Sequence, residues 1–286
     1  MPSALLFGAS GQIGRPLLAR LLGAGWEVVA VSRQARREPG TCWITGQLPT
    51  LGEVPGRYEV AFSCGPLDHF AAWYARHGAA IPRVVAFGST SVETKRASAD
   101  AGERDLAARL AAAEQAVFDA AARTGAAATV LRPTLVYGRG EDHTLTTIAA
   151  LGRRLRVLPL PRDATGLRQP VHVDDLAGAA LAAATAPAAH GRAYALPGGE
   201  TLPFREMAGR VAAALDPPAR VVGVPSALFR GALAIARLGG RARGFGREAS
   251  RRLREDLVFD PGPAARDFDY APRRFAPTAD MFRPVA

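Results

Sequence analysis

The sequence predicts a doubly wound α/β fold, and two observations support this prediction. Short continuous apolar runs recur through the first half of the chain, at residues 4–7, 27–32, 58–63, 83–88 and 128–133. Segments with the apolar spacing of amphipathic helices lie among and after them, at 12–22, 68–77, 102–123 and 174–184. Short apolar strands that alternate with helices are typical of a parallel sheet whose two faces are both covered.

The composition is that of a globular protein whose basic residues are almost all arginine. The chain has 286 residues, of which 48% are hydrophobic, enough for a substantial core. Its formal net charge of +10 would favour nucleic acid, but all basic residues except Lys95 are arginine. No stretch interleaves aromatic and basic residues as base stacking requires. We therefore expect a small-molecule substrate and no nucleic-acid partner.

The two cysteines, Cys42 and Cys64, form neither a disulfide framework nor a metal-ligand pattern, so no metal site is expected. No apolar run reaches the length of about 18 residues that a membrane span needs. These features predict a soluble cytoplasmic protein. The segment 226–248, an apolar stretch followed by arginines, is either a helix over the substrate cleft or a contact with an anionic membrane surface.

The first apolar run leads directly into a glycine-rich turn, ALLFGASGQIGRP, before the first predicted helix. Glycines at positions 8, 11 and 14 allow a tight exit from the strand, close approach to a pyrophosphate and close packing of the helix. A purely structural glycine turn is the alternative. For a dinucleotide, the predicted contacts in this turn are Gly8, Ser10, Gly11, Gln12, Ile13 and Gly14.

The end of the second strand predicts which dinucleotide is bound. An acidic residue there binds the ribose 2′-OH of NAD, whereas an arginine accommodates the 2′-phosphate of NADP. Here Ser32 and Arg33 end the strand, so the sequence favours NADP, with NAD as the alternative. Cys64 and Gly65, after the third strand, are further expected cofactor contacts. A solvated turn in an arginine-rich protein is the other interpretation of Arg33.

Four stretches together resemble the short-chain dehydrogenase/reductase superfamily: GASGQIG, RVVAFGSTSV, LRPTLVYGRGEDHTL and QPVHVDDLA. The resemblance spans residues 3 to 200 and is to the extended and atypical branch, related to nucleotide-sugar epimerases and dehydratases. It implies a Rossmann domain binding NAD(P) over residues 1–195. A smaller substrate-binding domain would follow over 196–286, with parts of 140–170 lining the substrate cleft.

The resemblance also implies a catalytic Ser/Thr, Tyr and Lys, and this sequence departs from that set. Ser89 matches the Ser/Thr position, but Leu106 and Leu110 occupy the positions of the tyrosine and the lysine. None of the five tyrosines is followed four residues later by lysine. The leucines would make the site apolar, and Lys95 is expected to be a solvated loop residue.

Other groups are then the candidates for the missing roles. The resemblance places Arg132, Pro133 and Thr134 beside the nicotinamide, and Tyr137 is a second catalytic candidate, or else a packed strand-end aromatic. His143, Arg168 and His172 are the predicted substrate contacts. A loop position for His143 and a bracing role for His172 are the alternatives.

Two classes of function remain open from the sequence. The first is an oxidoreductase or epimerase-like enzyme acting on a small, partly apolar carbonyl or hydroxyl compound. The second is a catalytically silent, NADP-binding redox sensor or assembly factor. The glycine turn and the predicted substrate domain favour the enzyme, whereas the missing tyrosine and lysine favour the sensor.

Overall fold

The computed structural model describes residues 1–229, 231 and 251–283, which belong to two compact units. Unit 1 comprises Met1–Thr134, Val173–Leu196 and Asp260–Ala271. Unit 2 comprises Leu135–His172, Pro197–Phe259 and Pro272–Ala286. In the described ranges, no helix has both the length and the apolar character needed to cross a membrane. Most of the segment 226–248, for which a helix was one of the two predictions, lies outside the described residues.

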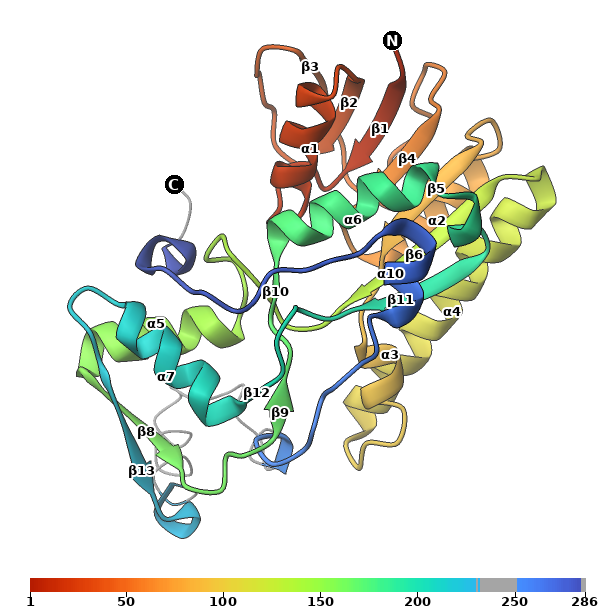
Figure 1. Ribbon diagram of the computed structural model, residues 1–286. Coiled ribbons are helices and arrows are strands. Elements are labelled where there is room, and N and C mark those ends of the chain that lie inside the picture. The colour runs from red at the N-terminus through yellow and green to blue at the C-terminus, as the bar shows by residue number, and fades with distance from the viewer. Residues whose placement is uncertain (230, 232–250, 284–286) are drawn as a thin grey trace. The chain divides into compact units, whose positions relative to one another are not determined.

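Unit 1 is built on a seven-stranded sheet in the order β11-β6-β5-β4-β1-β2-β3 (Figure 1). Every neighbouring pair in this sheet is parallel, which confirms the predicted doubly wound fold. The strands are β1 (Ser3–Phe7), β2 (Glu27–Ser32), β3 (Thr41–Thr45), β4 (Val60–Ser63), β5 (Arg83–Phe87), β6 (Ala127–Pro133) and β11 (Arg192–Leu196).

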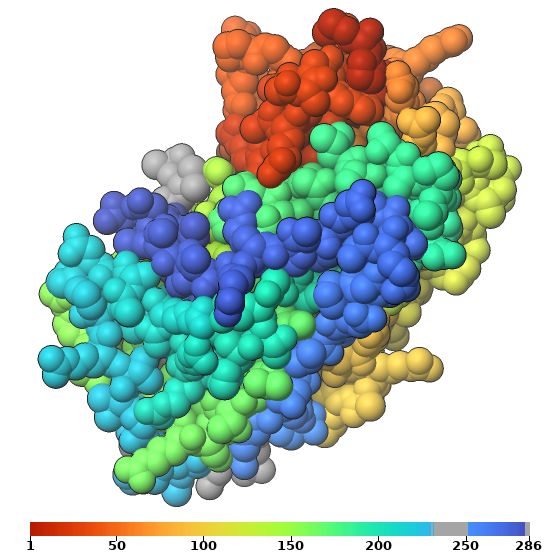
Figure 2. Space-filling model, in the orientation of Figure 1, coloured from red at the N-terminus to blue at the C-terminus, as the bar shows by residue number. Residues whose placement is uncertain are grey.

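Helices cover both faces of this sheet. On one face α1 (Gly14–Gly23) packs beside α6 (Val173–Thr185), and Figure 2 shows the two helices side by side. On the other face α2 (Leu67–His77) packs against α4 (Ala101–Thr124). Between α2 and the sheet lies an aromatic cluster, in which the Phe7 and Trp73 rings are 4.6 Å apart. Shorter helices are α3 (Ser91–Thr94), α10 (Gly262–Phe268) and the 3₁₀ turn η1 (Pro187–Ala189).

Helix α4 has clear start and stop signals. The Asp100 carboxylate accepts a hydrogen bond from the Glu103 N–H, and the Glu103 carboxylate accepts one from the Ser98 hydroxyl. This capping satisfies backbone donors that a helix start leaves free. The helix ends at Gly125, whose φ of 70° is the left-handed conformation that glycine adopts without strain.

The described residues of unit 2 include helices α5 and α7 and three small strand pairs. Helix α5 (Thr144–Leu155) packs on α7 (Phe204–Ala214), and β8 (Val157–Pro161) pairs in parallel with β13 (Arg220–Val224). The other pairs are β7 (Val136–Tyr137) with β10 (Val171–His172), and β9 (Leu167–Arg168) with β12 (Leu202–Pro203). The 3₁₀ turn η2 (Ala279–Phe282) closes a core that includes Leu145, Met207 and Phe282.

The division between the units is more interleaved than a single boundary at residue 195. Residues 135–172, expected in the first domain, lie in unit 2, and residues 260–271 return to unit 1. The physical reason is sheet pairing: β7, β8 and β9 pair with strands of unit 2, whereas α10 contacts β11 and α6 of unit 1.

One ion-pair network fastens the end of the chain to α7 within unit 2. The Arg210 guanidinium donates to both oxygens of Glu200, at 2.8 and 2.9 Å, and also to Glu206. The Glu200 carboxylate is largely buried and accepts a third hydrogen bond from the Phe275 N–H. The hydrogen bonds from Arg210 lower the pKa of Glu200 from its usual value near 4.5 to about 2.

We predict that Glu200→Gln lowers the free energy of unfolding by about 1–2 kcal/mol at neutral pH. Because the folded pKa is depressed, this stabilisation is present above pH 4.5 and is lost as the pH falls toward 2. Urea denaturation at several pH values measures both effects. Glu206→Gln is the matched control, because Glu206 pairs with the same arginine but is 49% exposed. Equal losses in the two variants would contradict this account.

Candidate functional site

The candidate site lies at the carboxyl ends of the unit 1 strands. From β1 the chain proceeds to β2 on one side, and the later strand β4 lies on the other side. This reversal is the topological switch point, where open α/β sheets bind their ligands. The loops that leave β1 and β4 meet there, because the Cys64 N–H donates to the Phe7 carbonyl at 3.0 Å.

The glycine turn is set by contacts that exclude side chains. Gly8 has a φ of +71°, and a Cβ there would lie 2.9 Å from the carbonyl carbon of Cys64. A Cβ on Gly14 would lie only 2.0 Å from the Gly8 oxygen. The Gly11 N–H donates to the Gly8 carbonyl at 3.0 Å, which closes the turn. These contacts bring the start of α1 directly against the end of β1.

The start of α1 has the properties of an anion-binding site. Neither a side-chain cap nor an acidic residue occupies its first turn. Free N–H groups and the positive end of a helix favour a phosphate at such a position. Gln12 Oε1 in the glycine turn and Ser63 Oγ at the end of β4 are both buried. Neither atom has a hydrogen-bond partner among the described residues. A dinucleotide therefore fits the residues present.

The end of β2 carries Ser32 and Arg33, as the sequence indicated. The buried Ser32 hydroxyl accepts the Gln34 N–H at 3.2 Å, so Ser32 shapes the turn. Arg33 is exposed and has no hydrogen bond or ion pair with any described residue. The next carboxylate along the chain, Glu38, is bound by Arg15, whose Nη1 lies 2.7 Å from both of its oxygens.

Ser89 lies just beyond the end of β5, where the resemblance placed the catalytic serine. Its Oγ accepts the Ser91 N–H at 3.1 Å at the start of α3. The hydroxyl proton of Ser89 has no acceptor among the described residues. Ser89 is half-buried, so a hydroxyl poised to donate lies at the ligand-binding edge of the sheet. Its catalytic role stays a prediction.

Arg132, near the end of β6, is held between two carboxylates. Its guanidinium donates to Glu114 of α4 through Nε and Nη2, and to Glu93 of α3 through Nη1 at 2.8 Å. Glu114 has a side-chain exposure of only 5%, so its charge requires this partner. Burial opposes the charge on Arg132, but the two carboxylates outweigh it and raise the Arg132 pKa. The predicted contact between Arg132 and a cofactor would have to form while the guanidinium is paired with these two carboxylates.

The other predicted contacts of unit 1 occupy neighbouring strand ends. The Pro133 carbonyl accepts both the N–H and the hydroxyl of Thr90, and the Thr134 N–H donates to Leu196. Burial raises the pKa of the Cys64 thiol, which favours its neutral form. Leu106 and Leu110 are half-buried on α4, about two turns and one turn before Glu114, respectively. Lys95 follows α3 and is half-buried.

The remaining predicted residues lie in unit 2 and are mostly engaged in its packing. Tyr137 is 1% exposed, and its ring meets the edges of His172 and Phe275 at 5.0 and 4.9 Å. His172 is itself buried on β10. This geometry agrees with the packing alternative for both residues, and their roles toward a substrate stay predictions. His143 is exposed at the start of α5.

Arg168 stabilises the fold of unit 2. Its guanidinium donates to the main-chain carbonyls of Leu167 and Glu255, both at 2.7 Å, and to that of Arg252. Burial lowers the Arg168 pKa, and the cation lies 5.6 Å from the Phe204 ring centroid. A substrate anion would have to displace these carbonyls, so the predicted anion contact is not supported by this geometry.

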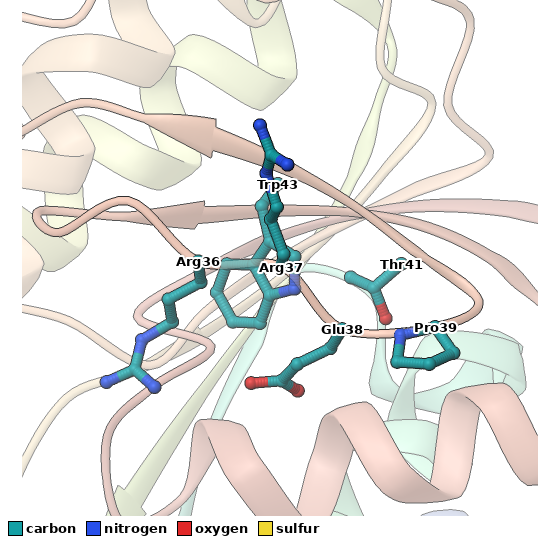
Figure 3. A pocket seen from close by; sticks show the side chains of 6 residues that line it. All are labelled: Arg36, Arg37, Glu38, Pro39, Thr41 and Trp43. Carbon is teal, nitrogen blue, oxygen red and sulfur yellow. The ribbon is translucent and has the colours of Figure 1, made fainter.

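Sequence reasoning missed several polar groups of unit 1. Glu114 lies on the alanine-rich apolar stripe of its helix and was not singled out. Because a buried charge requires a partner, an acid on such a stripe predicts a buried cation nearby. Thr41 and Trp43 lie on β3, whose sequence TCWIT lacks a continuous apolar run. With Arg36 they line a pocket, shown in Figure 3. In the described part of the chain, no cluster of His, Cys, Asp or Glu is arranged to hold a metal.

Taken together, the strand order, the glycine turn and the uncapped start of α1 define a Rossmann-type protein with a site suited to a dinucleotide. Residues 74–196 match the sequence model of the NAD dependent epimerase/dehydratase family. A related protein, the 2-alkyl-3-oxoalkanoate reductase of Stenotrophomonas maltophilia, is 34% identical over 183 residues. That alignment covers 58% of this chain and 53% of the reductase, so the chain spans about half the length of this relative.

Solved structures show the same fold at low sequence identity. The terminal R domain of the myxalamid biosynthetic pathway has a TM-score of 0.75 at 18% identity, covering 98% of this chain and 88% of that domain. The Bordetella bronchiseptica enzyme WbmH, solved with NAD+, has a TM-score of 0.68 at 16% identity, covering 99% and 96%. The resemblance predicted from the sequence is confirmed to this extent: residues 74–196 match the epimerase/dehydratase family model, and the chain shares its fold with these solved structures.

We predict that Gly14→Ala lowers the free energy of unfolding by about 2 kcal/mol or more, because the methyl group collides with the backbone of Gly8. Dinucleotide binding should be lost with it. Gly23→Ala, at the end of the same helix, is the control, because a Cβ there meets open space. Thermal unfolding and calorimetric titration measure the two effects. A Gly14→Ala protein with normal stability and binding would refute the steric account.

A second prediction concerns the clamp on Arg132. Glu114→Gln should cost about 2–4 kcal/mol, because it leaves a half-buried guanidinium without its main partner. Glu93→Gln should cost less than about 1 kcal/mol, because Glu93 is 51% exposed. Denaturant unfolding of the two variants gives the comparison. A larger loss in Glu93→Gln than in Glu114→Gln would reverse our ranking of the two carboxylates.

Proposed function

We propose that this protein is an NADP-dependent oxidoreductase that reduces the ketone group of a partly apolar substrate. One observation carries the proposal: the glycine turn holds the uncapped start of α1 against β1, with buried polar atoms nearby that lack partners. This arrangement supports a bound dinucleotide. The match to an NAD-dependent family supports a nicotinamide cofactor.

The proposed cofactor contacts follow the strand ends. The turn from Gly8 to Gly14 would hold the pyrophosphate, and Arg33 would meet a 2′-phosphate at the adenosine end. The Arg33 guanidinium is exposed and has no carboxylate partner among the described residues, which supports NADP. Because Glu38 is already bound by Arg15, it does not take the place of the acid that binds the ribose of NAD.

The reaction proposed is a carbonyl reduction. When bound, a reduced nicotinamide would supply a hydride for the carbonyl carbon, and the oxygen would gain a proton, so that the ketone would become a secondary alcohol. Ser89 would donate a hydrogen bond to that oxygen, since its proton is not otherwise engaged. With leucines at the tyrosine and lysine positions, the proton itself would come from water, and the rate would rest largely on positioning.

The relative at 34% identity supports the substrate class. Its name describes the reduction of a 3-oxoalkanoate that carries an alkyl branch, which combines a ketone with apolar chains. Half-buried leucines at positions 106 and 110 agree with an apolar substrate. We therefore place branched 3-oxo acids first among the substrates, with epimerase-like chemistry on a hydroxyl compound second. An exposed free thiol at Cys42 supports a reducing compartment, the cytoplasm, as the proposed location.

One observation favours a second function. Leu106 and Leu110 cannot transfer protons. Leucines at these two positions are therefore equally consistent with a redox sensor or assembly factor that binds NADP without turnover.

The discriminating experiment mixes purified protein with NADPH and a panel of 3-oxo acids, simpler ketones, aldehydes and quinones. We expect NADPH oxidation with at least one 3-oxo acid, and about a tenfold to hundredfold lower kcat in Ser89→Ala. Ser91→Ala is the matched control, because its backbone N–H, not its hydroxyl, contacts Ser89. Tight NADPH binding without oxidation of any compound would support the sensor instead.

Cofactor choice has its own test. Arg33→Asp should weaken NADPH binding by about a hundredfold while leaving NADH within a few fold, because it replaces an attractive charge by a repulsive one. Arg57→Asp makes the same charge change at an exposed position outside the site. Equilibrium titration of both dinucleotides against both variants gives the comparison. An equal loss of NADPH and NADH in Arg33→Asp would refute the assignment of the 2′-phosphate.

A further inference from the structure

The turn that carries Ser89 is attached to the end of β6. Pairing between β5 and β6 continues beyond the last residue of β5. The Gly88 N–H donates to the Leu131 carbonyl at 2.8 Å, and two residues later the Thr90 N–H donates to the Pro133 carbonyl at 3.3 Å. Ser89 lies between these two hydrogen bonds, so the end of β6 sets the position of its backbone.

The side chain of Thr90 adds a second hydrogen bond to the same acceptor. Thr90 is only 8% exposed, and its hydroxyl donates to the Pro133 carbonyl at 3.2 Å. Thr90 precedes α3 at a position where a threonine hydroxyl commonly accepts an N–H of the helix, but it makes no such bond here. The Ser89 hydroxyl accepts the Ser91 N–H instead, at 3.1 Å. The hydroxyl of Thr90 therefore attaches the turn to β6, while that of Ser89 is left to donate.

Helix α3 is too short to hold this geometry without such attachments. It has four residues, and a helix of one turn is unfavourable by itself. Its other end is also tied to β6, because Arg132 Nη1 donates to the Glu93 carboxylate at 2.8 Å. Arg132 and Pro133 are neighbours in β6, so one strand end holds both ends of the turn. Glu93 is 51% exposed, so water weakens its ion pair more than it weakens the buried bond of Thr90.

The orientation of Ser89 matters for the proposed reduction. Ser89 is the donor assigned to the carbonyl oxygen of the substrate, and Leu106 and Leu110 supply no other donor at the tyrosine and lysine positions. A hydrogen bond weakens steeply when its angle departs from linearity. A displacement of about 1 Å in a reacting group can lower a rate by about a hundredfold. A residue that fixes the turn around Ser89 therefore affects the rate without touching the substrate.

We propose that Thr90 is a positioning residue for Ser89: its hydrogen bond to the Pro133 carbonyl holds the Ser89 hydroxyl where it donates to the substrate ketone. This inference rests on the proposed function. The ion pair between Glu93 and Arg132 is the second, weaker attachment of the same turn. Because Thr90 acts through Ser89, its contribution to the rate requires the serine hydroxyl to be present.

The test introduces Thr90→Val, which replaces the hydroxyl by a methyl group, into the wild type and into Ser89→Ala. Oxidation of NADPH is followed with the 3-oxo acid that the wild type reduces fastest. In the wild type, Thr90→Val should lower kcat by about tenfold and change the Kd of NADPH by less than about twofold. In Ser89→Ala, the same change should lower kcat by less than about twofold. Thr90→Ser should restore most of the lost rate. A loss of folded protein would lower the rate equally in both backgrounds, so the comparison isolates positioning.

Thr94→Val is the matched control, because the Thr94 hydroxyl donates within the turn, to the Thr90 carbonyl at 3.3 Å. It should keep kcat within about twofold of the wild type, whereas Glu93→Ala should lower kcat by about twofold to fivefold.

Three results would overturn the inference and leave the proposed reductase in place. They are a wild-type kcat in Thr90→Val, equal losses from Thr90→Val in the two backgrounds, and a loss in Thr94→Val as large as that in Thr90→Val. Full activity of Ser89→Ala would remove the role of Ser89 and the inference with it, although the protein would still be a reductase. If the wild type oxidises NADPH with no compound of the panel, the proposed function itself fails, and no reaction remains for Thr90 to serve.

Discussion

The structure of the site depends on the close approach of two backbones at Gly8 and Gly14. The space that a single methyl group would need at Gly14 is filled by the carbonyl oxygen of Gly8. Because no side chain intervenes, α1 begins against the end of β1, beside the switch point between β1 and β4. The loop after β4 then packs on Gly8. A fixed set of donors at a sheet edge follows from this one steric constraint.

The arginines of this chain divide into two kinds according to their partners. Arg132, Arg168 and Arg210 are engaged, by buried carboxylates or by main-chain carbonyls, and they hold helices and chain segments together. Arg33 and Arg36 form no ion pair with any described carboxylate, and Arg36 lies 5.9 Å from the Trp43 ring centroid. Net charge alone does not distinguish these kinds, but the distribution of buried acids does. An arginine-rich composition therefore does not by itself describe what each cation contacts.

The central strands and the glycine turn were predictable, because a buried parallel strand reads as a continuous apolar run and a glycine turn has a fixed spacing. The edge strands β3 and β11 were not, since an edge strand is buried less completely and the short apolar stretches CWI and AYAL stand in more polar surroundings. The positions of Ser89 and Arg33 at strand ends followed from the pattern. The partners of Arg132 and Arg168 did not, because they come from residues distant in the sequence, such as Glu114 and Glu255.

The interleaving of the two units has a consequence for synthesis of the chain. The outer edge of β6 pairs with β11, yet the first segment of unit 2 is translated between them. Until Leu196 has left the ribosome, the main-chain groups of β6 on that side have no strand to bind. Open edges of this kind recruit other chains. During synthesis, a nascent chain of this protein therefore has a long interval in which the β6 edge of its sheet is unpaired and can pair with strands of other chains.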